Sequence, residues 1–223
     1  MTIKTTVDDP ALVGRRRAQL TKAAIACFSE RGYHTTTIRD VADRAGVSIG
    51  LIYQYIGDKE DLLFMALREV LDTYMRQIPL ALEGITDPLQ RFCTAVDVYC
   101  RVNGSSVEAT VLAYRETKSL RKERRAAIMR QELATNELIA ACVRDCIDAG
   151  LFEKTDVDLF VYQIVMFSHA WALKSWHFAK TMDVDTYVER GLKLMLQGVL
   201  TKAGTKRMQR LEAEGSVLAT TVA

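Results

Sequence analysis

Residues that interrupt helices are scarce in this chain, which has only 3 Pro and 12 Gly among 223 residues. Sheet-rich folds need many Gly and Pro turns between short strands, so the composition disfavours such a fold. Hydrophobic residues make up 49% of the chain and charged residues 26%, close to the average of globular proteins, which excludes a chain that is disordered throughout. We predict an all-α fold.

Segments for export or membrane insertion are also missing from the pattern. Gln163, Ser168 and His169 interrupt the apolar stretch 159–173, which falls short of the about 18 apolar residues of a membrane span. The opening residues MTIKTTVDDP hold no apolar run, so we expect neither a signal peptide nor an anchor. Five cysteines without a CxxC pair indicate buried thiols in a reducing compartment, and we expect a cytoplasmic protein without membrane contacts.

Motifs for catalysis and cofactor binding are absent from the sequence. It contains no G-x-S-x-G, no phosphate-binding P-loop and no G-x-G-x-x-G. The three histidines, His34, His169 and His177, are too scattered to suggest a tetrahedral metal site. We therefore expect neither an enzyme nor a bound cofactor or metal.

The N-terminal quarter of the chain carries the signals of a helix-turn-helix unit. A helix is expected over 15–31, and Thr37 and Asp40 are spaced as a capping box that starts a short second helix. Gly46 ends this second helix, and a third segment, 49–56, follows after a few residues. Two short helices joined by a tight turn and packed on a longer helix are typical of units that place the last helix in the major groove of DNA.

Breaks in the helical pattern divide the chain into four parts. Residues 1–13 lack periodicity and are expected to be a flexible arm, and residues 14–60 form the helix-turn-helix domain. Residues 61–200 form a second helical domain, with its longest helix expected over 121–149. Residues 201–223 lose apolar periodicity, which predicts a disordered tail.

The run FSERGYHTTTIRDVADRAGVSIGLIYQYIGDKEDLL, which starts at Phe28, resembles the N-terminal DNA-binding domain of the TetR family of bacterial regulators. The likeness depends on ordered features, including the Gly32-Tyr33 pair, the run AGVS at 45–48 and the Lys59-Glu60 pair. It implies an all-helical homodimer with two recognition helices facing DNA. A connecting helix would lead from each to a C-terminal bundle that dimerises and binds a ligand, whose presence would alter the separation of the recognition helices.

The resemblance also implies which residues contact DNA. By position they are Arg16, Arg17, Thr37, Arg39, Ser48, Ile49, Gly50, Leu51, Tyr53, Gln54, Tyr55 and Lys59. The side chains of Ser48, Tyr53 and Lys59 suit phosphate oxygens, and Gln54 can bond bidentately to an adenine edge. Family members often carry Lys at the position of Ile49, so one phosphate contact is lost here. For Tyr55, packing beneath the recognition helix is an equally weighted alternative.

A basic stretch precedes and opens the longest expected helix. Residues 115–130 contain seven basic residues and two acidic ones, which fits either a solvated helix face or an anion site. With the helices that follow, this stretch resembles TetR-family members that sense acyl-CoA, which implies arginines for the phosphates and an apolar tunnel. The ligand candidates are Arg121, Arg124, Arg125, Tyr162, Gln163, Met166, His169 and Trp171. For the last five, ordinary packing inside the domain or at a dimer contact is the alternative.

These observations predict a ligand-responsive transcriptional repressor. It would bind a pseudo-palindromic operator as a homodimer, with the helix expected over 185–200 in the dimer contact, and would be released by a small hydrophobic or acyl-CoA-type effector. One alternative is a DNA-binding dimer whose second domain only dimerises or contacts another protein. Another is redox sensing through Cys93 and Cys100, seven residues apart on one helix face.

Overall fold

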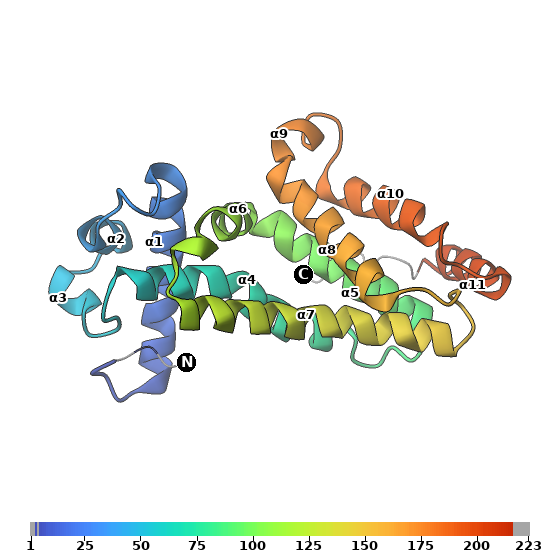
Figure 1. The fold of residues 1–223 in the computed structure, drawn as a ribbon, viewed down its shortest axis with the longest axis horizontal. Coiled ribbons are helices and arrows are strands. Elements are labelled where there is room, and N and C mark those ends of the chain that lie inside the picture. The colour runs from blue at the N-terminus through green and yellow to red at the C-terminus, as the bar shows by residue number, and fades with distance from the viewer. Residues whose placement is uncertain (1–2, 4, 216–223) are drawn as a thin grey trace. The chain divides into compact units, whose positions relative to one another are not determined.

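The computed structural model describes residue 3 and residues 5–215, and their regular structure is helical apart from one bridge between Phe152 and Leu200. The helices (Figure 1) are α1 (Pro10–Arg31), α2 (Ile38–Ala45), α3 (Ile49–Ile52), α4 (Lys59–Ala81), α5 (Pro88–Ser105), α6 (Val107–Glu116), the 3₁₀ turn η1 (Thr117–Ser119), α7 (Lys122–Asp148), α8 (Val157–Leu173), α9 (Ser175–Phe178), α10 (Val184–Leu196) and α11 (Lys202–Ala213). This architecture confirms the predicted all-α fold. Among the residues that the structure describes, no helix combines the length and the hydropathy of a membrane span.

The chain divides into two compact units that do not coincide with the expected domains. The first comprises residues 1–72 and 106–131, and the second comprises residues 73–105 and 132–223. The first unit reaches beyond residue 60 because α6, η1 and the start of α7 contribute to the core of the helix-turn-helix helices. Leu112, Leu120 and Ile128 are buried in that cluster.

The first helix begins earlier than the sequence pattern suggests, so the expected arm is wrong for residues 10–13. Asp9 caps α1, because its Oδ1 accepts hydrogen bonds from the backbone N–H groups of Ala11 at 2.9 Å and Leu12 at 3.1 Å. Pro10 fills the first helical position, where no N–H is needed. Val13 is buried against the core.

The expected disordered tail is wrong for Lys202–Ala213, which form α11. Thr201 caps this helix by accepting a hydrogen bond from Gly204 N at 3.0 Å. Met208 and Leu211 are buried, and α11 packs against α5. Only two buried apolar positions hold the helix, which is too weak a periodicity to stand out in the sequence. Residues 216–223 of the expected tail lie outside the described part.

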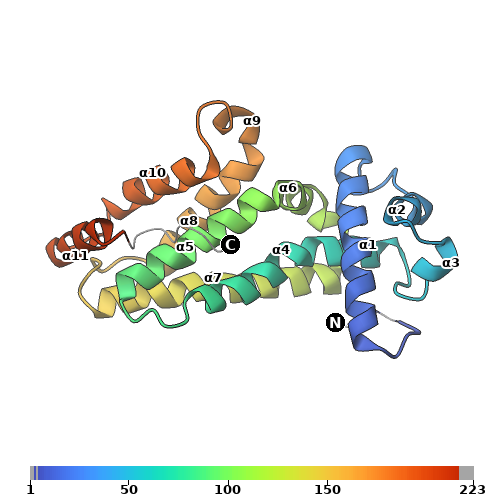
Figure 2. The same cartoon turned by 180° about the vertical axis from the view of Figure 1, so that it is seen from behind.

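The helix-turn-helix of the first unit has the predicted local chemistry. Thr37 Oγ1 accepts a hydrogen bond from Asp40 N at 3.1 Å, and Asp40 Oδ2 accepts one from Thr37 N at 2.7 Å, which confirms the capping box of α2. Gly46 ends α2 in the left-handed region with φ of 67°, a conformation that favours glycine. Figures 1 and 2 show α2 and α3 side by side at one end of this unit.

The second unit is a helical bundle in which α5 packs against α8, α10 and α11. The rings of Phe167 on α8 and Tyr187 on α10 stack with centroids 4.5 Å apart, and Tyr187 Oη donates a hydrogen bond to Phe167 O at 2.7 Å. Gly191 makes this approach possible, because a Cβ there would lie 2.1 Å from atoms of the Phe167 ring.

We expect Gly191→Ala to lower the free energy of unfolding by about 1–3 kcal/mol, since the added methyl must push the Phe167 ring out of its place. Gly198→Ala is the matched control, because the nearest atom to its Cβ would be 3.7 Å away. Urea denaturation of the two variants measures the difference. Equal stabilities would contradict the close packing of α8 on α10.

Candidate functional site

The recognition helix α3 presents one face outward and one inward. Ser48 caps it by accepting a hydrogen bond from Leu51 N at 3.2 Å. Ile52 is fully buried, whereas the side chain of Tyr53 is 50% exposed. The exposed residues around the helix are Ser48, Ile49, Gly50, Tyr53 and Gln54. This surface combines hydroxyl, amide and aliphatic groups, which suit contacts with phosphates and base edges.

Tyr55 is buried beneath the recognition helix, with 3% of its surface exposed. Its ring belongs to the hydrophobic core together with Ile52 and Ile56. This placement corrects its assignment as a DNA contact in favour of the packing alternative. Leu51 is half-buried and lies next to the same core.

The predicted basic contacts at the start of α1 differ from one another. Arg17 donates hydrogen bonds to Ile3 O at 2.8 Å and to Tyr55 O at 3.3 Å, so it holds the end of the recognition segment. Burial lowers the pKa of its guanidinium. Arg16 Nη1 donates to Gln19 Oε1 at 2.8 Å, and Arg39 is exposed on α2. Arg39 is therefore better placed than Arg17 to reach a phosphate.

Lys59, at the first position of α4, is held by the protein itself. Its Nζ donates hydrogen bonds to Tyr33 O at 2.9 Å, Thr36 O at 3.0 Å and His34 O at 3.2 Å. The same ammonium lies 4.5 Å from the centroid of the Tyr33 ring. Lys59 thus ties α4 to the turn between α1 and α2, in addition to any contact with DNA.

The arginines expected to bind phosphates face carboxylates at the start of α4. Arg121 Nη2 lies 2.8 Å from Asp58 Oδ2, and Arg124 Nη2 donates to Asp61 Oδ1. Arg124 is 9% exposed. Arg125, by contrast, is exposed on α7. Two of the three arginines are therefore neutralised within the first unit.

The other ligand candidates lie in different surroundings. Tyr162 and Met166 are exposed on α8, and Gln163 borders a hollow of 220 Å³ between α8 and the end of α10. Trp171 is buried next to Phe178 and Tyr187. These placements favour packing or dimer contact for most of them.

Among these candidates, His169 has a strongly lowered side-chain pKa. Its ring lies 6.1 Å from that of Tyr99, and burial lowers the pKa of the imidazole to about 4. The ring is therefore neutral at neutral pH and can accept or donate a hydrogen bond inside the second unit.

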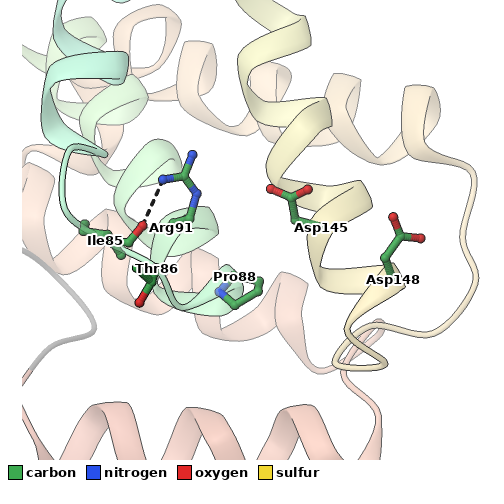
Figure 3. A pocket seen from close by; sticks show the side chains of 6 residues that line it. All are labelled: Ile85, Thr86, Pro88, Arg91, Asp145 and Asp148. Atoms are coloured by element: carbon green, nitrogen blue, oxygen red, sulfur yellow. Dashed lines mark hydrogen bonds between the residues drawn. The ribbon is translucent and has the colours of Figure 1, made fainter.

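A second hollow, of 500 Å³, lies at the start of α5 and the end of α7 (Figure 3). Arg91 Nη1 donates hydrogen bonds there to Leu82 O at 3.1 Å and to Ile85 O at 3.0 Å. Asp145 and Asp148 stand on the opposite wall, so this hollow would repel a phosphate or carboxylate ligand.

Sequence reasoning missed Asn136, a buried polar residue on α7. It is 6% exposed, and neither its Oδ1 nor its Nδ2 has a hydrogen-bond partner among the residues that the structure describes. Buried polar groups without partners are rare, and a role in binding or an ordered water is the usual explanation. The signal was present, because Asn136 shares the helix face of the buried Ile139 and Val143.

The cysteines offer little for redox sensing. Cys93 and Cys100 are buried as free thiols, and burial raises the pKa of each to about 12. Oxidation proceeds through the thiolate, which is scarce at such a pKa.

Comparison with known proteins decides the family. Residues 20–66 match the family described as bacterial regulatory proteins, tetR family, and residues 86–179 match a tetracyclin repressor-like C-terminal domain. Over 216 residues the chain is 47% identical to the HTH-type transcriptional regulator HbdR of Aromatoleum sp. (strain CIB), an alignment that covers 97% of this chain and 94% of HbdR. The chain belongs to the TetR family.

Other transcriptional regulators resemble it at lower identity. The HTH-type transcriptional repressor KstR2 of Rhodococcus jostii is 27% identical over 195 residues, which cover 86% of this chain and 95% of KstR2. The transcriptional regulator FadR of Bacillus subtilis, solved in complex with stearoyl-CoA, has the same fold, with a TM-score of 0.69 at 19% identity over 81% of this chain and 98% of FadR. The chain is thus a helix-turn-helix transcriptional regulator of the TetR family, as its sequence indicated.

We expect Lys59→Ala to lower the free energy of unfolding by about 1–3 kcal/mol, because three backbone carbonyls lose a charged donor. Lys22→Ala, at an exposed position of α1, removes the same charge from the same unit and serves as the control. Urea denaturation compares the two. If both variants unfold at the same urea concentration as the original chain, the Lys59 ammonium has no structural role.

Proposed function

We propose that this protein is a dimeric transcriptional repressor that binds a pseudo-palindromic operator through α3 and is released by a small effector. The observation that carries the proposal is the division of α3 into a buried face and an outward face. Ile52 anchors the helix, while Tyr53 and Gln54 remain exposed at its end. The similarity to KstR2, a transcriptional repressor, supports repression as the direction of control.

The proposed contacts with DNA follow from what the outward face offers. Ser48 and Tyr53 bind phosphates through their hydroxyls, Gly50 lets the backbone approach, and Gln54 reads an adenine edge. Arg39 on α2 adds a phosphate contact. The ammonium of Lys59 already donates hydrogen bonds to backbone carbonyls of the protein. A contact between Lys59 and a DNA phosphate would have to share this ammonium with them. No catalysis is required for this role, and we place the protein in the cytoplasm with its DNA.

A second copy of the chain is needed for two recognition helices. Leu159, Tyr162 and Met166 form an exposed apolar stripe along α8, at spacings of three and four residues. On α10, Leu194 is 70% exposed. Such exposed apolar stripes are typical of homodimer contacts, and we assign α8 and α10 to the interface between the two copies.

We propose an acyl-CoA-type effector bound in the second unit. FadR of Bacillus subtilis binds stearoyl-CoA within the same fold, which supports this ligand class. The orphaned amide of Asn136 is suited to hydrogen-bond a carbonyl or hydroxyl of the ligand. The competing proposal is a regulator without an effector, and a thermal-shift screen with acyl-CoAs separates the two, since ligand binding to the native state raises the melting temperature.

Selection of genomic fragments by the pure protein tests the DNA-binding proposal and yields the operator. We expect Gln54→Ala to lose about 1–3 kcal/mol of discrimination at one base pair per half-site, because the bidentate contact to adenine disappears. Fluorescence anisotropy with operators mutated at each position measures this. Thr5→Ala is the control, because the exposed Thr5 donates a hydrogen bond to Gln54 O. This variant alters the backbone contact at Gln54 without changing its side chain. Equal loss of affinity for every operator sequence would contradict base reading by Gln54.

Asn136→Leu should raise the melting temperature of the free protein, because it removes unpaired buried polar atoms worth about 1–3 kcal/mol. It should also reduce by more than half the thermal shift that an acyl-CoA panel produces. Thr135→Val is the matched control, since Thr135 is also buried but its hydroxyl donates a hydrogen bond to Glu132 O at 2.7 Å. An unchanged ligand shift in Asn136→Leu would remove Asn136 from the effector site.

A further inference from the structure

The carboxylate of Asp61 bonds the backbone of the turn that follows the recognition helix. Asp61 Oδ2 accepts hydrogen bonds from Gly57 N at 2.7 Å and Asp58 N at 3.2 Å. Asp61 is 4% exposed. A Cβ at Gly57 would lie only 3.3 Å from that same oxygen, so the turn sits tightly against the carboxylate. The position of Asp61 therefore fixes where the segment 55–58 leaves the core.

Arg124 on α7 holds Asp61 from the other side. Its Nη2 donates to Asp61 Oδ1, and its Nη1 lies 3.6 Å from Asp58 Oδ1 and 3.7 Å from Glu60 Oε1. The guanidinium also lies over the Phe64 ring, with 5.5 Å between its carbon and the ring centroid. A buried arginine with this geometry is a fixed point, because its planar fork and its stacking leave it few other orientations.

Arg121 forms a second, outer contact with the same turn of α4. Its backbone N donates to Glu60 Oε1 at 2.9 Å, and its Nε lies 2.5 Å from Glu60 Oε2. This side chain is 58% exposed, so its ion pairs contribute much less than a buried one. The inner pair, Arg124 with Asp61, is therefore the rigid part of the cluster.

The halves of α4 and α7 that belong to the first unit run in the same direction. Asp61 pairs with Arg124, and about two turns further along both helices Arg68 Nε donates to Gln131 Oε1 at 3.1 Å. The two helices lie side by side in both views (Figures 1 and 2). A displacement of the first turns of α7 would therefore reach Asp61 directly, without intervening side chains.

We propose that Arg124 is a positioning residue for DNA recognition: through Asp61 it sets the turn at Gly57 and Asp58, and thereby the angle at which α3 leaves the core. Arg124 touches no DNA in this role. Arg124 and its outer neighbour Arg121 thus link α7 to the turn after the recognition helix, rather than binding the phosphates of a ligand. The proposal rests on the DNA-binding function proposed above.

The experiment compares Arg124→Met, Asp61→Asn, the double variant and Arg144→Gln in the full chain. Methionine keeps the apolar contact with Phe64 but removes the charge, and asparagine keeps an acceptor for Gly57 N. Arg144 is an exposed arginine on the same helix, paired with Glu137, and controls for a lost charge. Affinity is measured for the selected operator and for scrambled duplex, at several salt concentrations and at a temperature where all variants are folded by circular dichroism.

We expect Arg124→Met to bind the operator at least tenfold more weakly, with unchanged affinity for scrambled duplex and an unchanged salt slope, because no phosphate contact is lost. The double variant should regain much of the melting temperature lost in the single variants, since neither charge is then left unpaired. It should remain at least tenfold weaker on the operator. Arg144→Gln should bind both duplexes like the original chain.

Hydrogen exchange of the free protein gives a readout that needs no DNA. Arg124→Met and the double variant should exchange at least tenfold faster over residues 52–62, with no change in α8 and α10. Unchanged exchange there would overturn the proposal, as would full recovery of operator affinity in the double variant. A salt slope reduced by about one would overturn it in favour of a direct phosphate contact. Failure of the original chain to prefer any fragment, with faster exchange in the variants, would instead refute the proposed function alone.

Discussion

The recognition helix depends on contacts outside itself, because α3 is a single turn of four residues. A helix of that length is not stable in isolation, since the cost of its first turn is not repaid by further hydrogen bonds. Its backbone is held by the cap at Ser48, and Ile52 in the helix and Ile56 just after it are anchored in the core. The proposed DNA-binding surface is therefore the face of α3 that does not pack on the core. Its orientation depends on the contacts of Ser48, Ile52 and Ile56.

The first turn of α4 joins these anchors into one structure. Lys59 reaches back to the turn between α1 and α2, Asp61 holds the turn after α3, and Arg124 fixes Asp61 from α7. Replacing a buried ion pair by apolar residues often costs little stability. A gain in stability alone therefore does not explain why Arg124 and Asp61 are paired here. Its value lies in fixing geometry, because a guanidinium between carboxylates tolerates little displacement.

Local chemistry could be predicted from the sequence, whereas long-range pairing could not. The capping box at Thr37 and the helix end at Gly46 involve neighbouring residues, and both are found where the pattern places them. The basic residues of α7 look free in the sequence because Asp61, the carboxylate that Arg124 meets, lies 63 positions earlier. Helix α11 was missed because its apolar face holds so few buried side chains.

The central claim is that two outward-facing copies of α3 read one operator, and a hydroxyl-radical footprint of the protein on a selected fragment tests it most directly. The account predicts two protected patches on one face of the duplex, one on each half of an inverted repeat. Their centres should lie one helical turn of DNA apart, about 34–36 Å, or a multiple of that distance. A single protected patch, or protection that does not depend on sequence, would contradict it.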